Sequence, residues 1–130
     1  MHKIFISHTR DSYEYARNLG AELKSFADVA VMDETEAIRG ESIQNLIKRK
    51  LQASDVVIVL LTEGAAESPW VMFEIGAALG LGKRILPVLM GDLDHDKIDY
   101  LIRDQQYLDA RLLNPTQTAK EIIRSAHLAD

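Results

Sequence analysis

A tryptophan and a glutamate, Trp70 and Glu74, stand four residues apart in a segment that begins Ser68-Pro69. Serine followed by proline is typical of a helix start, so both side chains are expected on one helix face. The stripe that helical spacing buries is formed by Val71, Ile75, Ala78 and Leu79. It leaves Glu74 on its flank, which suits a partly desolvated catalytic carboxylate. The alternative is a solvated surface glutamate whose stem packs on Trp70.

A second polar cluster is the acidic loop between Asp33 and Glu41, which follows an apolar run and precedes a helical pattern. Asp33 stands at the predicted strand tip, where its carboxylate could accept hydrogen bonds from ligand hydroxyls. Gly40 permits a backbone conformation closed to other residues. The alternative is an exposed loop whose carboxylates favour the N-terminus of the next helix.

The third cluster, Ser7-His8-Thr9-Arg10-Asp11, follows the first apolar run. His8 or Arg10 is placed to meet a phosphate. Thr9 or Asp11 is also suited to cap the following helix, and the two interpretations are compatible.

Several other chemistries are excluded or disfavoured. The chain has no cysteine, which removes thiolate nucleophiles, disulfides and cysteine-based metal sites. The four histidines show no metal-ligand spacing. The acidic run after Gly91 resembles a calcium loop, but Lys97 replaces its required glycine and Arg103 its closing glutamate. The glycines at 76, 80 and 82 lie within or after a helix, so no phosphate loop is predicted.

Apolar runs of strand length alternate with amphipathic segments of helix length. The predicted strands are Lys3–Ser7, Val29–Met32, Val56–Leu61, Ile85–Met90 and a weak Gln106–Leu108. The predicted helices are Asp11–Phe26, Ser42–Gln52, a third from Ser68 to near Gly80 or Gly82, and Thr116–His127. Phe26 is expected to face inward, and Pro87 to disturb strand pairing. This alternation predicts parallel strands in a three-layer α/β/α sandwich, with ligands at the carboxyl ends of the strands.

The composition fits one globular domain. The chain has 130 residues, of which 47% are hydrophobic, and a net charge of −5. This charge argues against non-specific binding to nucleic acid or anionic lipid. No apolar run is long enough to cross a membrane and no signal core is evident, so a cytoplasmic location is expected.

Taken in order, these motifs resemble a Toll/interleukin-1 receptor (TIR) domain of the bacterial kind over essentially the whole chain. The first strand and turn, Phe5-Ile6-Ser7-His8 with Asp11, are similar to the start of that family. Asp33 and Gly40 are similar to the ends of its BB loop, and the stretch from Ile47 to Leu61 to its second helix and central strand. Ser68-Pro69-Trp70 with Glu74 resembles its Trp-x-x-x-Glu signature.

The resemblance implies a flavodoxin-like, five-stranded parallel sheet in the order 2-1-3-4-5. It also implies cleavage of NAD+ at the nicotinamide–ribose bond, giving nicotinamide and ADP-ribose or a cyclic isomer, with no cofactor or metal. Glu74 is then the catalytic carboxylate. The implied substrate-binding residues are Phe5, Ser7, His8, Arg10, Asp33 and Trp70, and the implied assembly or gating residues of the BB loop are Glu36, Ile38, Arg39 and Gly40.

The resemblance also implies partners. Members of the family commonly act only when self-associated, driven by a sensor domain that is either fused or separate, and this predicts an immune or stress effector. The loop lacks the proline that often precedes Gly40 in animal adaptors, which favours a prokaryotic effector. Two alternatives stay open: a non-catalytic scaffold that binds other TIR domains, and a nucleoside 2-deoxyribosyltransferase-like enzyme, whose helices can carry a run similar to Glu74-Ile75-Gly76-Ala77-Ala78.

Overall fold

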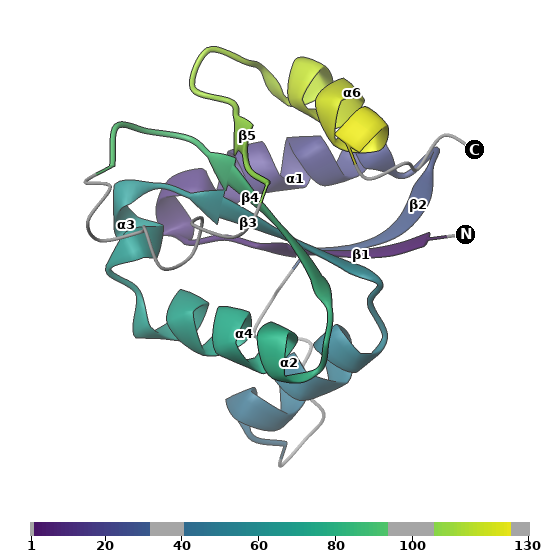
Figure 1. The fold of residues 1–130 in the computed structure, drawn as a ribbon, viewed down its shortest axis with the longest axis vertical. Coiled ribbons are helices and arrows are strands. Elements are labelled where there is room, and N and C mark those ends of the chain that lie inside the picture. Colours follow the sequence, from purple (N-terminus) through teal and green to yellow (C-terminus); the bar gives the residue numbers. More distant parts are fainter. Residues whose placement is uncertain (1, 32–40, 94–105, 126–130) are drawn as a thin grey trace.

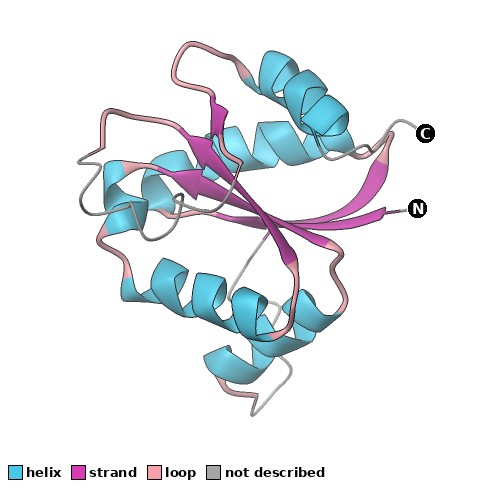
Figure 2. Ribbon diagram, in the orientation of Figure 1, coloured by secondary structure: helices cyan, strands magenta, loops and turns pink. Residues whose placement is uncertain are grey.

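The fold is a twisted parallel sheet between two layers of helices, in a computed structural model that describes residues 2–31, 41–93 and 106–125 (Figures 1 and 2). The strands are β1 (His2–Ser7), β2 (Ala27–Val31), β3 (Val56–Leu61), β4 (Arg84–Leu89) and β5 (Leu108–Asp109). They lie in the order β2-β1-β3-β4-β5, and every neighbouring pair is parallel. The predicted fold class and strand order are confirmed.

The helices cover both faces of the sheet. They are η1 (Arg10–Ser12), α1 (Tyr13–Leu23), α2 (Ile43–Gln52), α3 (Glu63–Ala66), α4 (Pro69–Gly80) and α6 (Pro115–Ser125). Figure 1 shows α1 and α6 on one face, α2 and α4 on the other, and α3 beyond the carboxyl end of β3. In the described part of the chain, no helix has the length and apolar character needed to cross a membrane.

Strand alternation divides the core into two layers. Ile4 and Ile6 of β1 pack toward α1 and α6, and Phe5 packs toward α2 and α4. All six residues of β3 are buried, as expected for a strand covered on both faces. Because side chains alternate, Ser7 shares the face of Phe5, and this is the face that α4 covers.

Local signals set the helix ends. The Ser42 side chain accepts a hydrogen bond from the Asn45 N–H, and the Ser68 side chain accepts one from the Val71 N–H. The Ser68 cap is the one that the sequence predicts, and Pro69 takes the first position of α4. The predicted end near Gly80 or Gly82 is confirmed. Gly82 has a φ of 68°, a conformation that glycine adopts without steric cost.

Two predicted inward positions are wrong. Phe26 is 41% exposed, because α1 ends at Leu23 and Phe26 lies in the turn that follows. Leu79 is 54% exposed, because the buried face of α4 is centred on Val71, Glu74, Ile75 and Ala78. At about 100° per residue, Leu79 falls roughly a quarter-turn away from the centre of that face.

The irregular pairing expected at Pro87 is also wrong. The register between β3 and β4 continues through Pro87, which lies opposite Val59. On the other side of β4, pairing with β5 begins only at Val88, so the missing N–H of Pro87 interrupts no ladder there.

Other differences concern boundaries. The fifth strand is Leu108–Asp109, shifted from the prediction, and the short helix α3 was not predicted. Met32 at the predicted end of the second strand and His127 at the predicted end of the last helix lie outside the described residues.

Candidate functional site

Glu74 is fully buried, on the side of α4 that faces the sheet. Its neighbours on that face are the buried residues Val71, Ile75 and Ala78. A glutamate is seldom buried completely, because its carboxylate gives up favourable hydration. The alternative of a solvated surface glutamate is therefore wrong, and the sequence underestimated how deeply Glu74 lies.

Trp70 is the second residue of α4, one helical turn before Glu74. Since α4 follows β3 and α3, its first turn lies nearer than Glu74 to the carboxyl ends of the strands. The side chain of Trp70 lies outside what the structure describes, and its expected contact with a ligand stays a prediction.

The end of β1 places three predicted substrate-binding residues differently. Phe5 is a fully buried core residue, packed among the apolar side chains between the sheet and α2 and α4. Ser7 is also fully buried on that face. Arg10 is exposed at the start of η1. The structure thus brings Ser7 and Glu74 into the same layer, between the sheet and its helical cover.

Two polar atoms at this strand end are buried and unsatisfied. Within the described part of the chain, neither Ser7 Oγ nor His8 Nε2 has a hydrogen-bond partner. His8 Nδ1 lies 3.1 Å from the carbonyl oxygen of Thr9, which can only accept, so Nδ1 donates. Buried groups of this kind are uncommon and call for an explanation, such as a ligand.

The helix cap expected from Thr9 or Asp11 is wrong. Neither η1 nor α1 has a side-chain cap at its first turn. The chain enters α1 through a tight turn in which the Ser12 N–H donates to the Thr9 carbonyl at 3.1 Å. The Asp11 carboxylate instead accepts a hydrogen bond from the Thr9 hydroxyl and lies against the start of α3.

The ionisation of Asp11 reflects these contacts. Burial acts to raise the pKa of its carboxyl. Hydrogen bonds from the hydroxyls of Thr9 and Thr62 and from the Gly64 backbone outweigh burial and hold the pKa below its ordinary value of 3.8. Asp11 is therefore a carboxylate at neutral pH.

The predicted BB-loop residues Glu36, Ile38, Arg39 and Gly40, and the predicted ligand residue Asp33, lie outside the described residues. The described chain resumes at Glu41, whose carboxylate pairs with Arg49 of α2 at 3.1 Å.

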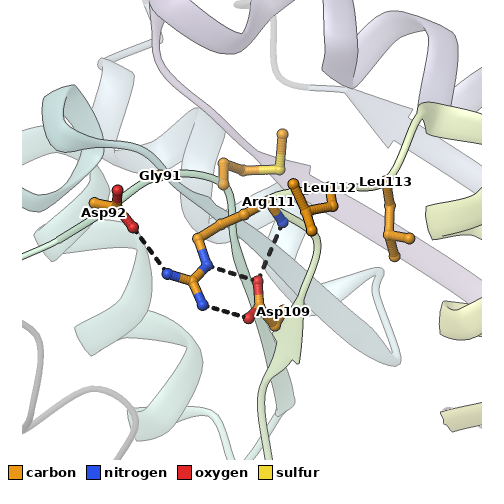
Figure 3. A pocket seen from close by; sticks show the side chains of 7 residues that line it. Gly91, Asp92, Asp109, Arg111, Leu112 and Leu113 are labelled. Atoms are coloured by element: carbon orange, nitrogen blue, oxygen red, sulfur yellow. Dashed lines mark hydrogen bonds and ion pairs between the residues drawn. The ribbon is translucent and has the colours of Figure 1, made fainter.

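A pocket of about 680 Å³ opens at the carboxyl ends of β4 and β5. It is lined by Met90, Gly91, Asp92, Asp109, Arg111, Leu112 and Leu113. Figure 3 shows the Arg111 guanidinium between two carboxylates, 2.7 Å from Asp109 and 2.8 Å from Asp92. The sequence pointed to Gly91 and Asp92 as residues after a strand, but it missed Arg111 and Asp109. The only signal for them was their place after a weak fifth strand.

The charged side chains that line this pocket form ion pairs with one another. Hydrogen bonds from Arg111 lower the pKa of Asp109 to about 2, and the two carboxylates raise the pKa of Arg111. Glu74 does not line this pocket. Among the described residues, no group of three or more His, Cys, Asp or Glu side chains is arranged to hold a metal ion.

Comparisons with known proteins agree on the fold. The sequence model of the TIR domain family matches residues 4–123. The TIR domain of the Toll-related receptor TRR-2 from Hydra magnipapillata has a TM-score of 0.76 and 16% identity, over 98% of this chain and 99% of that one. No curated protein gave a significant sequence match.

Two enzymes share the fold at similarly low identity. The CMP N-glycosidase BcmB of Clostridium botulinum has a TM-score of 0.66 and 15% identity, over 95% of this chain and 98% of that one. A 2-desoxiribosyltransferase from Leishmania mexicana has a TM-score of 0.62 and 17% identity, over 98% of this chain and 100% of that one. At such identities the likeness establishes the architecture alone.

Proposed function

Because the chain belongs to the TIR domain family, we propose that it cleaves NAD+ at the nicotinamide–ribose bond with Glu74 as the catalytic carboxylate. The observation that carries this proposal is the complete burial of Glu74 on the sheet-facing side of α4. It lies one turn from the helix start, and that start is near the carboxyl ends of the strands. This is the edge where open α/β sheets bind ligands.

The chemistry needs little beyond such a carboxylate. Nicotinamide leaves NAD+ as a neutral base, so no acid has to protonate it. The ribose left behind develops positive charge like that of an oxocarbenium ion. A carboxylate removed from bulk water stabilises this charge strongly and can hydrogen-bond the ribose hydroxyls. Water then attacks the sugar carbon and releases a proton, giving ADP-ribose, or a group of the same nucleotide attacks and gives a cyclic isomer.

The two enzymes of similar fold support this reaction class. By their names, one hydrolyses and the other transfers at a bond between a sugar and a base. The fold is thus compatible with a reaction at the bond between a sugar and a base.

The domain is further proposed to work in the cytoplasm as an assembly-activated effector of bacterial immunity or stress, without a cofactor. Self-association, or association with other TIR domains, would bring it into its active state. A sensor domain, fused or separate, would supply the signal.

Incubation of the concentrated protein with NAD+, followed by chromatography of the products, tests this proposal. We expect Glu74→Gln to lower nicotinamide release by about 10²- to 10³-fold, because charge stabilisation of the transition state is lost. Glu121→Gln on α6, which covers the opposite face of the sheet, is the matched control and keeps full activity. Circular dichroism verifies that all three proteins are folded. Equal turnover by Glu74→Gln and the parent would remove Glu74 from the mechanism.

A deoxyribosyltransferase-like activity is the second candidate, favoured by the similarity to the Leishmania enzyme. Glu74 would then act as a covalent nucleophile at the sugar. Exchange of free bases between deoxynucleosides, with a glycosylated Glu74 detected by mass spectrometry, would establish this activity in place of NAD+ cleavage.

A non-catalytic scaffold is the third possibility. Robust nicotinamide release by the concentrated parent would exclude it.

A further inference from the structure

Two loops meet across the point where the strand order of the sheet reverses. β1 has β2 on one side and β3 on the other, so the chain leaves the sheet in opposite directions from this position. The ligand crevice of such a sheet lies between the loops that follow those two strands. Here they are the turn from β1 into η1 and the turn from β3 into α3.

Asp11 joins these two turns. Its carboxylate accepts a hydrogen bond from the Thr9 hydroxyl within the first turn. The Thr9 and Thr62 hydroxyls, one from each turn, lie 3.3 Å apart. Thr62 also accepts the Ala65 N–H at 3.1 Å, so the same hydroxyl fixes the start of α3.

Gly64 shows how closely the two turns approach. A Cβ atom placed on Gly64 would lie 2.8 Å from Asp11 Oδ2 and 3.2 Å from Asp11 Cγ. A Cβ atom essentially never lies as close as 2.8 Å to another heavy atom, so a side chain at this position would shift the Asp11 carboxylate. The absence of a side chain at Gly64 lets the Asp11 carboxylate lie against the Gly64 backbone.

The first turn also carries polar atoms that the fold leaves unused. Ser7 Oγ and His8 Nε2 are buried and have no partner among the described residues. Ser7 lies in the layer of Glu74, and the His8 ring leans on Tyr13, with ring centroids 5.8 Å apart. A hydroxyl and a ring nitrogen are both groups that can hydrogen-bond the hydroxyls of a sugar.

We infer that Asp11 is a positioning residue that locks the β1 turn to the α3 turn and so holds Ser7 and His8 in place for the substrate. This inference rests on the proposed function, since it takes the ribose of NAD+ as the group to be held. Asp11 itself touches no substrate in this account. It acts through the geometry of the turn, which is fixed before the ligand arrives.

Two substitutions, one in each turn, disrupt the contact between Asp11 and Gly64. Asp11→Asn keeps the size of the side chain but puts an amide donor among the donors of Thr9, Thr62 and Gly64. Gly64→Ala keeps Asp11 but pushes its carboxylate away. Gly80→Ala is the matched control, because it is also a helical glycine and a Cβ there meets nothing within 4 Å.

Steady-state kinetics with NAD+ separate positioning from stability. We expect Asp11→Asn and Gly64→Ala each to raise KM by about tenfold, the equivalent of one charge-assisted hydrogen bond, with a smaller change in kcat. Thermal midpoints should stay close to that of the parent, and Gly80→Ala should keep the parent KM. An unchanged KM would overturn the inference. It would do so even if kcat fell in proportion to the folded fraction of the protein.

Nuclear magnetic resonance distinguishes failure of the inference from failure of the proposed function. In the parent, the Gly64 amide should exchange slowly with solvent. Asp11→Asn should release this amide and shift the His8 ring signals, whereas Gly80→Ala should do neither. If the concentrated parent releases no nicotinamide, the proposed function is wrong. The Gly64 exchange rate and the His8 ring signals then test the positioning role of Asp11 by themselves. Fast exchange of Gly64 in the parent, or an unshifted His8 ring in Asp11→Asn, would then refute the positioning role.

Discussion

Ser7 is a residue whose buried hydroxyl lowers the stability of the fold but is proposed to help bind the substrate. Its oxygen is buried and has no hydrogen-bond partner in the part of the chain that the structure describes, and burying an unpaired hydroxyl costs free energy. A group retained at a cost to stability is a candidate for function.

We therefore expect Ser7→Ala to leave the free energy of unfolding unchanged or to raise it by about 1 kcal/mol, because the unsatisfied hydroxyl is removed. The same substitution should weaken NAD+ binding. Urea unfolding followed by tryptophan fluorescence measures the first effect, and KM for NAD+ measures the second. A clear loss of stability would mean that the Ser7 hydroxyl makes a hydrogen bond within the folded protein and is not available to a ligand.

The sequence draws attention to Glu74 but misjudges the surroundings of its side chain. Glu74 was singled out from its spacing to Trp70, but helical periodicity put it on the flank of the buried face and not within it. Periodicity identifies the buried face of a helix from its apolar residues alone, so it places a buried carboxylate to one side of that face. The partners of Asp11 were missed for another reason, since Thr9 and Thr62 are 53 positions apart in the sequence.

At the scale of elements, one glycine within α4 and one just after it should respond to substitution in opposite directions. Gly76 lies within the helix, and a Cβ there meets nothing within 4 Å. Gly82 follows the helix with a φ of 68°, where side chains other than glycine are strained.

We expect Gly76→Ala to raise the free energy of unfolding by about 0.5–1 kcal/mol, because alanine loses less backbone entropy in a helix. Gly82→Ala should lower it by about 1 kcal/mol, because a Cβ disfavours the left-handed conformation. Chemical denaturation of the two variants in parallel with the parent checks both signs. Equal effects of the two would contradict this account of the end of α4.

The elements themselves were largely predictable. β3 coincides with its predicted range, since a run of six apolar residues rich in β-branched side chains is a local signal. The start of α4 was predicted from Ser68 and Pro69, which also act locally. The sequence missed α3, because its four residues are too few to show a period, and it placed the two-residue β5 imprecisely.

At the scale of the whole molecule, acid stability should depend on the ion pairs at the end of β5. Asp109 has a pKa of about 2 in the folded protein, below its ordinary value of 3.8. A carboxyl with a lowered pKa contributes stability above its unfolded value, and that contribution is lost as pH falls toward the folded value.

We therefore expect the difference in free energy of unfolding between the parent and Asp109→Asn to be constant above about pH 5 and to vanish near pH 2. The difference should be small and should shrink in high salt, because both partners are largely exposed. Urea titrations across this range measure it. A difference that grows on acidification would rule out Arg111 as the cause of the lowered pKa.

The two ends of the described chain lie on the same edge of the molecule. His2 begins β1, and the carbonyl of Ser125, the last residue of α6, accepts a hydrogen bond at 2.8 Å from Arg84, the first residue of β4. Figure 1 shows both ends on the side of the sheet away from α3. Any tether joined there would attach on the side of the sheet away from Asp11 and Thr62, the two residues that join the turns after β1 and β3.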